Sequence, residues 1–173
     1  MGQTTGKQKK DKQPKETDGI RALLESYPTL QRRIDCMEER LAFLEAGMDS
    51  PSSPNLSGMP GGSRDRTSKQ ERDYIKAEEL RARLDDLYAE ESQKREDIEA
   101  LIERMEKPQE QTAIEMHYLD GAHWRAVSVA LYSNEPDYDE HEQRYLKRTF
   151  KVHGSALQTL ARIYKDEIQE GDA

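Results

Sequence analysis

Hydrophobic residues recur at spacings of three and four along the first part of the chain. The stripe consists of Ile20, Leu23, Tyr27, Leu30, Ile34, Met37, Leu41 and Leu44. A pattern sustained over about four heptads is typical of a helix that packs along a second helix. Asp18 is placed to cap the start of this helix, and Gly47 is a suitable stop. Pro28 interrupts the stripe and predicts either a kink or the start of a new helix.

A second stripe with the same spacing predicts helix over residues 69–107, ended by Pro108. Its apolar positions are Ala77, Leu80, Leu84, Leu87, Ile98, Leu101 and Met105. Glu91 and Lys94 stand where apolar residues are expected, so the predicted seam is weak in its middle. Between the stripes, residues 47–68 are rich in Ser, Gly and Pro and have no apolar period, which indicates a linker.

Two such stripes joined by a linker predict an antiparallel, coiled-coil-like helical hairpin over residues 18–107. At about 1.5 Å per residue the first helix is near 40 Å long, enough to lie along most of the second. An intermolecular coiled coil satisfies the same stripes, so self-association through these seams is an open alternative.

After Pro108 the pattern changes to short helices. Residues 109–119 and 124–131 carry apolar side chains at helical spacing, and Asp120-Gly121 between them predicts a turn. Residues 133–142 then hold five acidic residues and no Lys or Arg. Acidic side chains are favourable at a helix start, so this segment offers caps for the next helix. The candidate caps are Asp137, Asp139 and Glu140.

The last predicted helix, residues 144–165, contains six Lys or Arg residues and no Asp or Glu. On a helix its polar side falls within roughly 100° of arc. This side carries Arg144, Lys147, Arg148, Lys151, Ser155, Gln158, Arg162 and Lys165. The opposite, packed side is predicted to carry Leu146, Phe150, His153, Leu157, Leu160 and Tyr164. One packed face and one acid-free basic face suit a helix that enters the major groove of DNA.

Composition narrows the classes of protein that fit. Charged residues make up 36% of the 173 residues and hydrophobic residues 34%, which is typical of long solvated helices. No apolar run is long enough to span a membrane and no signal-peptide pattern is present, so we expect a cytoplasmic protein. The net charge of −8 argues against polyanion binding over the whole surface. It leaves room for a local basic face, because charges act over about 10 Å. The polar residues 1–17 predict a disordered basic tail.

Little in the sequence points to catalysis. The single cysteine, Cys36, excludes an intramolecular disulfide and a cysteine-cluster metal site. The four histidines lack the spacing of metal ligands, and His153 on the apolar side is more typical of a core. No phosphate-binding loop is present. We therefore expect a protein that is not an enzyme and that holds no metal or cofactor.

Two C-terminal segments match a known pattern. They are AIEMHYLDGAHWRAVSVALY at 113–132 and RTFKVHGSALQTLA at 148–161, with a Gly turn at Gly121, a Trp-led helix at Trp124 and a His153-Gly154 pair before Ala156-Leu157. This part of the chain resembles region 4 of bacterial sigma-70 factors and, more closely, the phage and prophage transcriptional regulators of the RinA- and ArpU-like group. The linker sequence Gly58-Met59-Pro60 is also similar to prophage members.

The resemblance implies an all-α protein in which the hairpin precedes a helix-turn-helix at residues 108–165, with a short tail at 166–173. It also implies binding to double-stranded DNA, a contact with RNA polymerase and a bacterial host cell. Family members join the last two helices by a tight turn, whereas here the acidic segment 134–142 intervenes. That segment could cap the last helix, shield it or set its docking angle. Nothing resembles the sigma segment that binds the −10 element, so a complete sigma factor is not implied.

On the DNA-binding hypothesis, the predicted contacts fall into two groups. Arg144, Lys147 and Arg162 are placed to neutralise phosphate, while Arg148, Lys151 and Ser155 are placed to reach base edges. Gly154 is predicted to permit close approach of a neighbouring helix. Two alternative functions remain: a small terminase-like DNA-packaging subunit, and a coiled-coil interaction protein without a nucleic-acid role.

Overall fold

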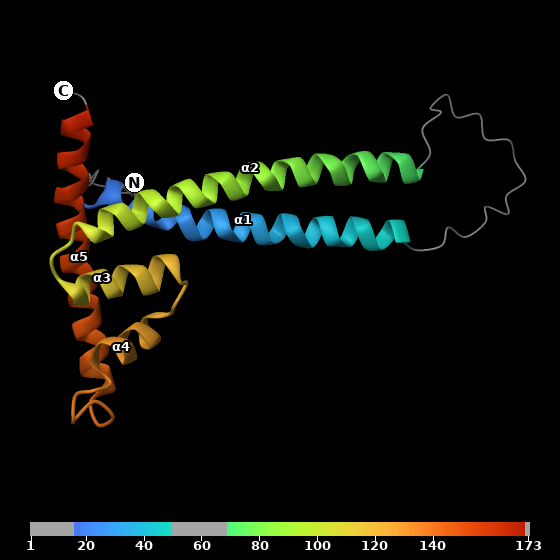
Figure 1. Cartoon of the computed structure of the whole chain (residues 1–173). Helices are drawn as coiled ribbons and strands as arrows, with labels where there is room; N and C mark the ends of the chain where they lie inside the picture. Colours follow the sequence, from blue (N-terminus) through green and yellow to red (C-terminus); the bar gives the residue numbers. More distant parts are fainter. Residues whose placement is uncertain (1–15, 50–68, 172–173) are drawn as a thin grey trace, which may run out of the picture.

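The computed structural model describes residues 16–49 and 69–171, and every secondary-structure element in these two ranges is helical (Figure 1). The all-α prediction is confirmed for this part of the chain. The predicted basic tail before residue 16 and the linker at 50–68, including Gly58-Met59-Pro60, lie outside the described residues.

The first two helices form a long stalk. Helix α1 (Asp18–Asp49) and helix α2 (Lys69–Glu103) lie side by side and run in opposite directions (Figure 1). Their apolar stripes face each other in a central cluster of Leu30, Ile34, Leu84 and Leu87, with Met37 and Leu41 at its border. This pairing buries the stripes within a single chain.

Two interruptions that the sequence predicts in the first helix are absent from helix α1. It runs through Pro28 without starting anew, and it continues past Gly47 to Asp49. A proline removes one backbone hydrogen bond of the helix. The buried side chains on both sides of Pro28, Leu24 and Leu30, hold the helix axis against its neighbours.

A polar layer explains the weak middle of the seam. Tyr27 of α1 is completely buried, and its hydroxyl donates a hydrogen bond to the carboxylate of Glu91. The same hydroxyl accepts hydrogen bonds from Gln31 at 3.1 Å and Arg95 at 3.4 Å. Burial, followed by the bond to Glu91, raises the pKa of Tyr27. The polar residues at this level are therefore paired across the stalk, between two apolar clusters.

The larger apolar cluster lies where the stalk meets helix α5 (Glu142–Gly171), which crosses the end of the stalk at a steep angle (Figure 1). Here Leu24 is fully buried whereas Leu23 of the predicted stripe is only partly buried. The buried face shifts because α1 contacts α5 and the following segments as well as α2. The cluster comprises Ile20, Leu24, Tyr27, Ile98, Leu101, Ile102, Met105, Ile114, Tyr118, Leu119, Ala156, Leu157, Leu160 and Ala161.

Two short helices pack along α5: α3 (Pro108–Ile114) and α4 (Trp124–Tyr132). The π-helix η1 (Glu115–Leu119) between them contacts α1, α3 and α4, and it reaches α5 through the hydroxyl of Tyr118. The Asp120 amide donates to the Glu115 carbonyl at 3.0 Å, and Gly121 has a φ of 68°, which favours glycine. The predicted turn at Asp120-Gly121 thus follows one wide helical turn. Helix α5 itself begins at Glu142 and extends beyond the predicted end at Lys165 to Gly171.

Candidate nucleic-acid interface

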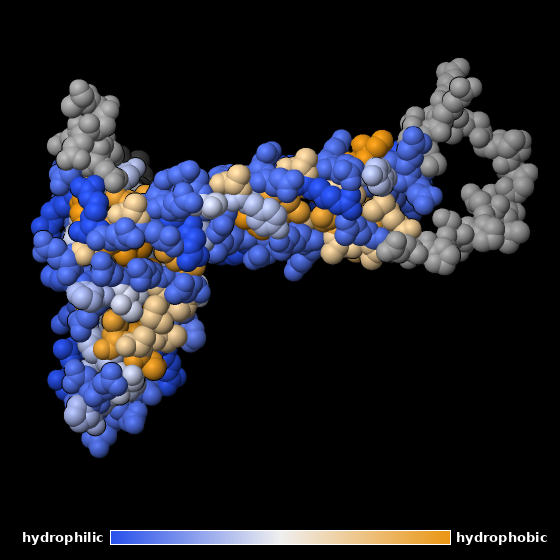
Figure 2. Space-filling model, in the orientation of Figure 1, coloured by the Kyte–Doolittle hydropathy of each residue, from blue (hydrophilic) through white to orange (hydrophobic). Residues whose placement is uncertain are grey.

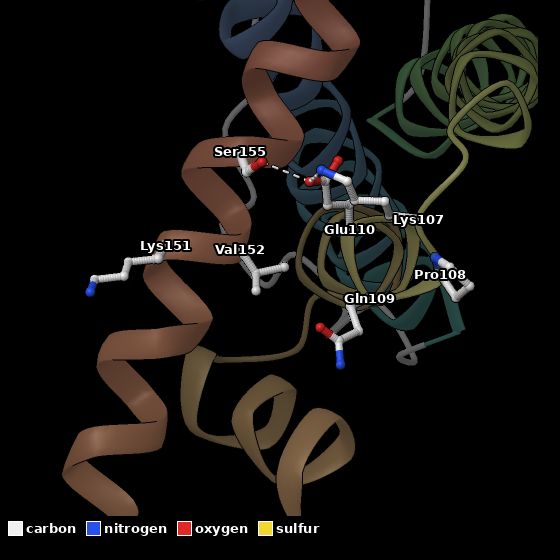
Figure 3. Close-up of a pocket in the computed structure, with 7 residues that line it drawn as sticks. All are labelled: Lys107, Pro108, Gln109, Glu110, Lys151, Val152 and Ser155. Carbon is white, nitrogen blue, oxygen red and sulfur yellow. Dashed lines mark hydrogen bonds and ion pairs between the residues drawn. The ribbon is translucent and has the colours of Figure 1, made fainter.

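Helix α5 exposes its cationic side chains along one side. These exposed residues, called the basic face below, are Arg144, Lys147, Arg148, Lys151, Gln158, Arg162 and Lys165. The buried side chains of the same helix, among them Tyr145, Thr149 and Leu160, face the rest of the protein. Figure 2 shows hydrophilic surface along the outer edge of α5, and in Figure 3 Lys151 points away from α3. The helices that contact α5 pack mainly on its other side, and α3 and α4 reach the border of the basic face at Ser155 and Arg148.

Arg148 is held in place by aromatic rings. Its guanidinium lies 5.0 Å from the ring centroid of Tyr132 and 5.4 Å from that of Tyr145. These two rings form a small cluster with Tyr138, at the junction of α4, the loop and α5. Cation–π contacts of this kind orient a guanidinium while leaving its N–H groups free to donate. Arg148 is therefore a pre-oriented cation at the edge of the basic face.

The acidic segment folds back onto the first turns of α5. Asp137 accepts a hydrogen bond from Arg144 at 3.2 Å and another from the hydroxyl of Tyr145. The bond from Tyr145, partly opposed by desolvation, lowers the pKa of Asp137. Asp137 therefore contacts side chains of α5 and does not cap its start. The first-turn acid is Glu142, which pairs with Arg125 of α4, and the other two predicted caps, Asp139 and Glu140, are exposed in the preceding turns.

The remaining cations differ in how much they are engaged. Among the described residues, Lys147 and Lys151 make no ion pair. Arg162 donates only to the Gln158 carbonyl of its own helix, at 3.4 Å, and Lys165 pairs with Glu16 at 3.2 Å across two exposed side chains. Exposed pairs such as these contribute little and are readily exchanged.

The hydroxyl of Ser155, which was predicted to reach base edges, is already bonded within the protein. This hydroxyl donates to Glu110 of α3 at 2.7 Å (Figure 3), and Thr159 donates to the other carboxylate oxygen at 2.9 Å. Glu110 is only 4% exposed, and Lys107 donates to it at 2.9 Å. Burial alone would raise the pKa of Glu110, but these three hydrogen bonds outweigh it and lower the pKa. Ser155 therefore fastens α3 to α5.

An aromatic group connects η1, α4 and α5. Trp124 stacks on His117 at 3.8 Å between ring centroids and lies 4.6 Å from His153, which is 3.1 Å from the hydroxyl of Tyr118. Burial, then the neighbouring His117 and Arg21, lower the pKa of His153 to about 4. His153 is thus a neutral core histidine at pH 7. Among the described residues no group of His, Cys, Asp and Glu side chains is arranged to hold a metal ion.

Two positions on α5 differ from the prediction. Phe150 was expected on the packed side but is 46% exposed. Gly154 is also exposed, and a Cβ there would meet no atom within 4 Å, so it does not serve the close approach of a helix. The buried face of α5 is rotated about the helix axis relative to the predicted one, because α3 and α4 pack against it. A second stripe could have revealed this: Tyr145, Val152, Ala156, Leu160 and Ile163.

Comparison with family models, with curated proteins and with solved structures found no match to this chain. No helix among the described residues is both long and apolar enough to cross a membrane.

Proposed function

We propose that this chain is a sequence-specific DNA-binding regulator of transcription whose recognition helix is α5. One observation carries the proposal: over residues 144–165 the exposed side of α5 has six cations and no acid, and most of the packing partners of α5 lie on its other side. The major groove admits an α-helix between two rows of phosphates. A solvated helix with no ligand usually mixes both signs of charge, as α2 does.

The contacts divide according to how each side chain is held. Lys147 and Arg162 are extended, weakly engaged cations suited to phosphate, whose contacts position a protein without specifying sequence. Arg148, held over Tyr132 and Tyr145, is suited to the O6 and N7 atoms of guanine, and Lys151 can reach the same edge. Arg144 is also suited to contact phosphate, once DNA replaces Asp137 as its partner.

The order of elements supports the same function. A helix (α3 with η1), a glycine turn, a second helix (α4), a loop and a long basic helix follow one another as in a helix-turn-helix. The resemblance of residues 113–132 and 148–161 to phage and prophage regulators supports a role of this type in a bacterial host. The proposed contact with RNA polymerase rests on that resemblance alone.

The experiment begins with selection of bound sequences from random duplex DNA. The double variant Arg148→Ala/Lys151→Ala should then bind the selected duplex at least about 30-fold more weakly, since each lost base contact costs about 1–3 kcal/mol. The control is Arg33→Ala/Arg83→Ala, which removes two exposed cations from the stalk and should keep full affinity. Equal affinity of the two double variants, both helical by circular dichroism, would overturn the proposal.

A second candidate is a DNA-packaging subunit that assembles through its stalk. Three large apolar side chains near the far end of the stalk are exposed and could serve such an assembly: Phe43, Tyr74 and Ile75. Light scattering separates the candidates, because a packaging ring requires a large oligomer whereas a regulator acts as a monomer or dimer. A coiled-coil interaction protein without a nucleic-acid role would show no salt-dependent DNA binding at all.

A further inference from the structure

Phe150 is exposed beside the basic face. It is the one large hydrophobic side chain on the described part of α5 that is substantially exposed, at 46%. At 100° per residue it lies about 60° round the helix from Lys147 and about 100° from Lys151, so it stands at the border of the basic face. An aromatic ring in this position is costly in water, since its burial would be favourable.

The ring of Phe150 is supported on one side. Its centroid lies 5.4 Å from that of Trp124, with an angle of 56° between the planes. Trp124 is itself stacked on His117 and packed near His153. Phe150 is thus oriented by a rigid neighbour and still presents nearly half of its surface outward.

The surface of α5 next to Phe150 carries no side chain at Gly154. Gly154 lies one turn farther along α5, and no atom stands within 4 Å of where its Cβ would be. Phe150 and Gly154 therefore form a short apolar strip next to Lys147, with Lys151 beyond it. By contacting the phosphates of DNA, the two lysines would hold the strip against the floor of a groove.

Only one apolar group is displayed on base edges in the major groove, the C5-methyl group of thymine. We propose that Phe150 contacts this methyl group and selects thymine at one position of the bound site. The inference rests on the proposed function, because it requires α5 to lie in the major groove. It supplies a specificity that the cations of the basic face cannot, since Arg and Lys favour guanine.

The test uses the full chain and the duplex selected from random DNA. Each thymine is replaced in turn by deoxyuridine, which removes the methyl group and keeps base pairing. At one position the affinity should fall about fourfold, the factor expected for burial of one methyl group. The variant Phe150→Ala should bind the thymine and uracil duplexes equally, and Phe150→Leu should retain part of the difference.

The matched control is Phe43→Ala, the same substitution at an exposed phenylalanine of the stalk, which should keep the full thymine preference. Specific binding in which no thymine-to-uracil change matters would overturn the role of Phe150 and leave the proposed function intact. The same holds if Phe150→Ala discriminates as the original chain does. Failure to bind any duplex, or binding without sequence preference, would overturn both.

Discussion

Individual side chains of the C-terminal part are held by specific partners, and His153 is the clearest case. It lies partly buried between Tyr118, His117 and Trp124, and its pKa is lowered to about 4 from an ordinary 6.5. Desolvation disfavours the charged imidazolium, and His117 and Arg21 add to this effect. The core around Trp124 therefore requires a neutral ring.

This shift predicts that stability depends on pH. Between about pH 6.5 and pH 4 the unfolded chain binds a proton at His153 and the folded chain does not. The free energy of unfolding should therefore fall as pH is lowered through this window and be insensitive to His153 above it. Urea denaturation of His153→Gln should show a shallower fall. The control His123→Gln, at an exposed histidine, should keep the original slope, and equal slopes would contradict the assignment.

At the level of elements, α3 is attached to α5 by a buried carboxylate. Glu110→Ala would leave the hydroxyl of Ser155 without its acceptor and that of Thr159 with only the Ser155 carbonyl, and we expect a loss of about 2 kcal/mol in the free energy of unfolding. Gln109→Ala, at the exposed neighbouring position, should change it by less than about 0.5 kcal/mol. Chemical denaturation measures the free energy of unfolding of both variants. A similar loss in the two would show that the hydrogen bonds of Glu110 contribute no particular stability.

How far the sequence predicts each element depends on the range of the interactions involved. Apolar spacing located α1 and α2, and the charge pattern at helical spacing located the exposed cations of α5, because both patterns are local properties of the sequence. The partner of Ser155 lies 45 residues earlier in the chain, so no local pattern shows that this hydroxyl is occupied. The exposure of Phe150 likewise depends on where α4 lies, and the run of α1 through Pro28 depends on packing at its two sides.

On the scale of the whole molecule, two apolar clusters are separated by the polar layer around Tyr27 and Glu91. The central stalk cluster connects only α1 and α2, whereas the cluster at the base connects α1, α2, α3, η1 and α5. Residues in different clusters should therefore affect stability over different regions.

Hydrogen exchange of two alanine variants tests this division. Leu87→Ala, in the stalk cluster, should lower the protection of amides in the outer stalk and leave those of α5 unchanged. Leu160 is fully buried in the larger cluster, where the stalk meets α5. Leu160→Ala should lower the free energy of unfolding by about 2–5 kcal/mol and lower amide protection in all helices. A uniform loss of protection in Leu87→Ala would mean that the polar layer does not separate the two regions.

The position of Cys36 on the stalk has a practical consequence. It is the single cysteine of the sequence, it is exposed, and it belongs to a helix that extends away from α5 (Figure 1). A maleimide dye or a surface linker would therefore attach at one defined point, far along the chain from α5. Molecules tethered through this thiol would all present α5 to the solution in the same way, so single-molecule tests of the proposed DNA binding need no engineered attachment site.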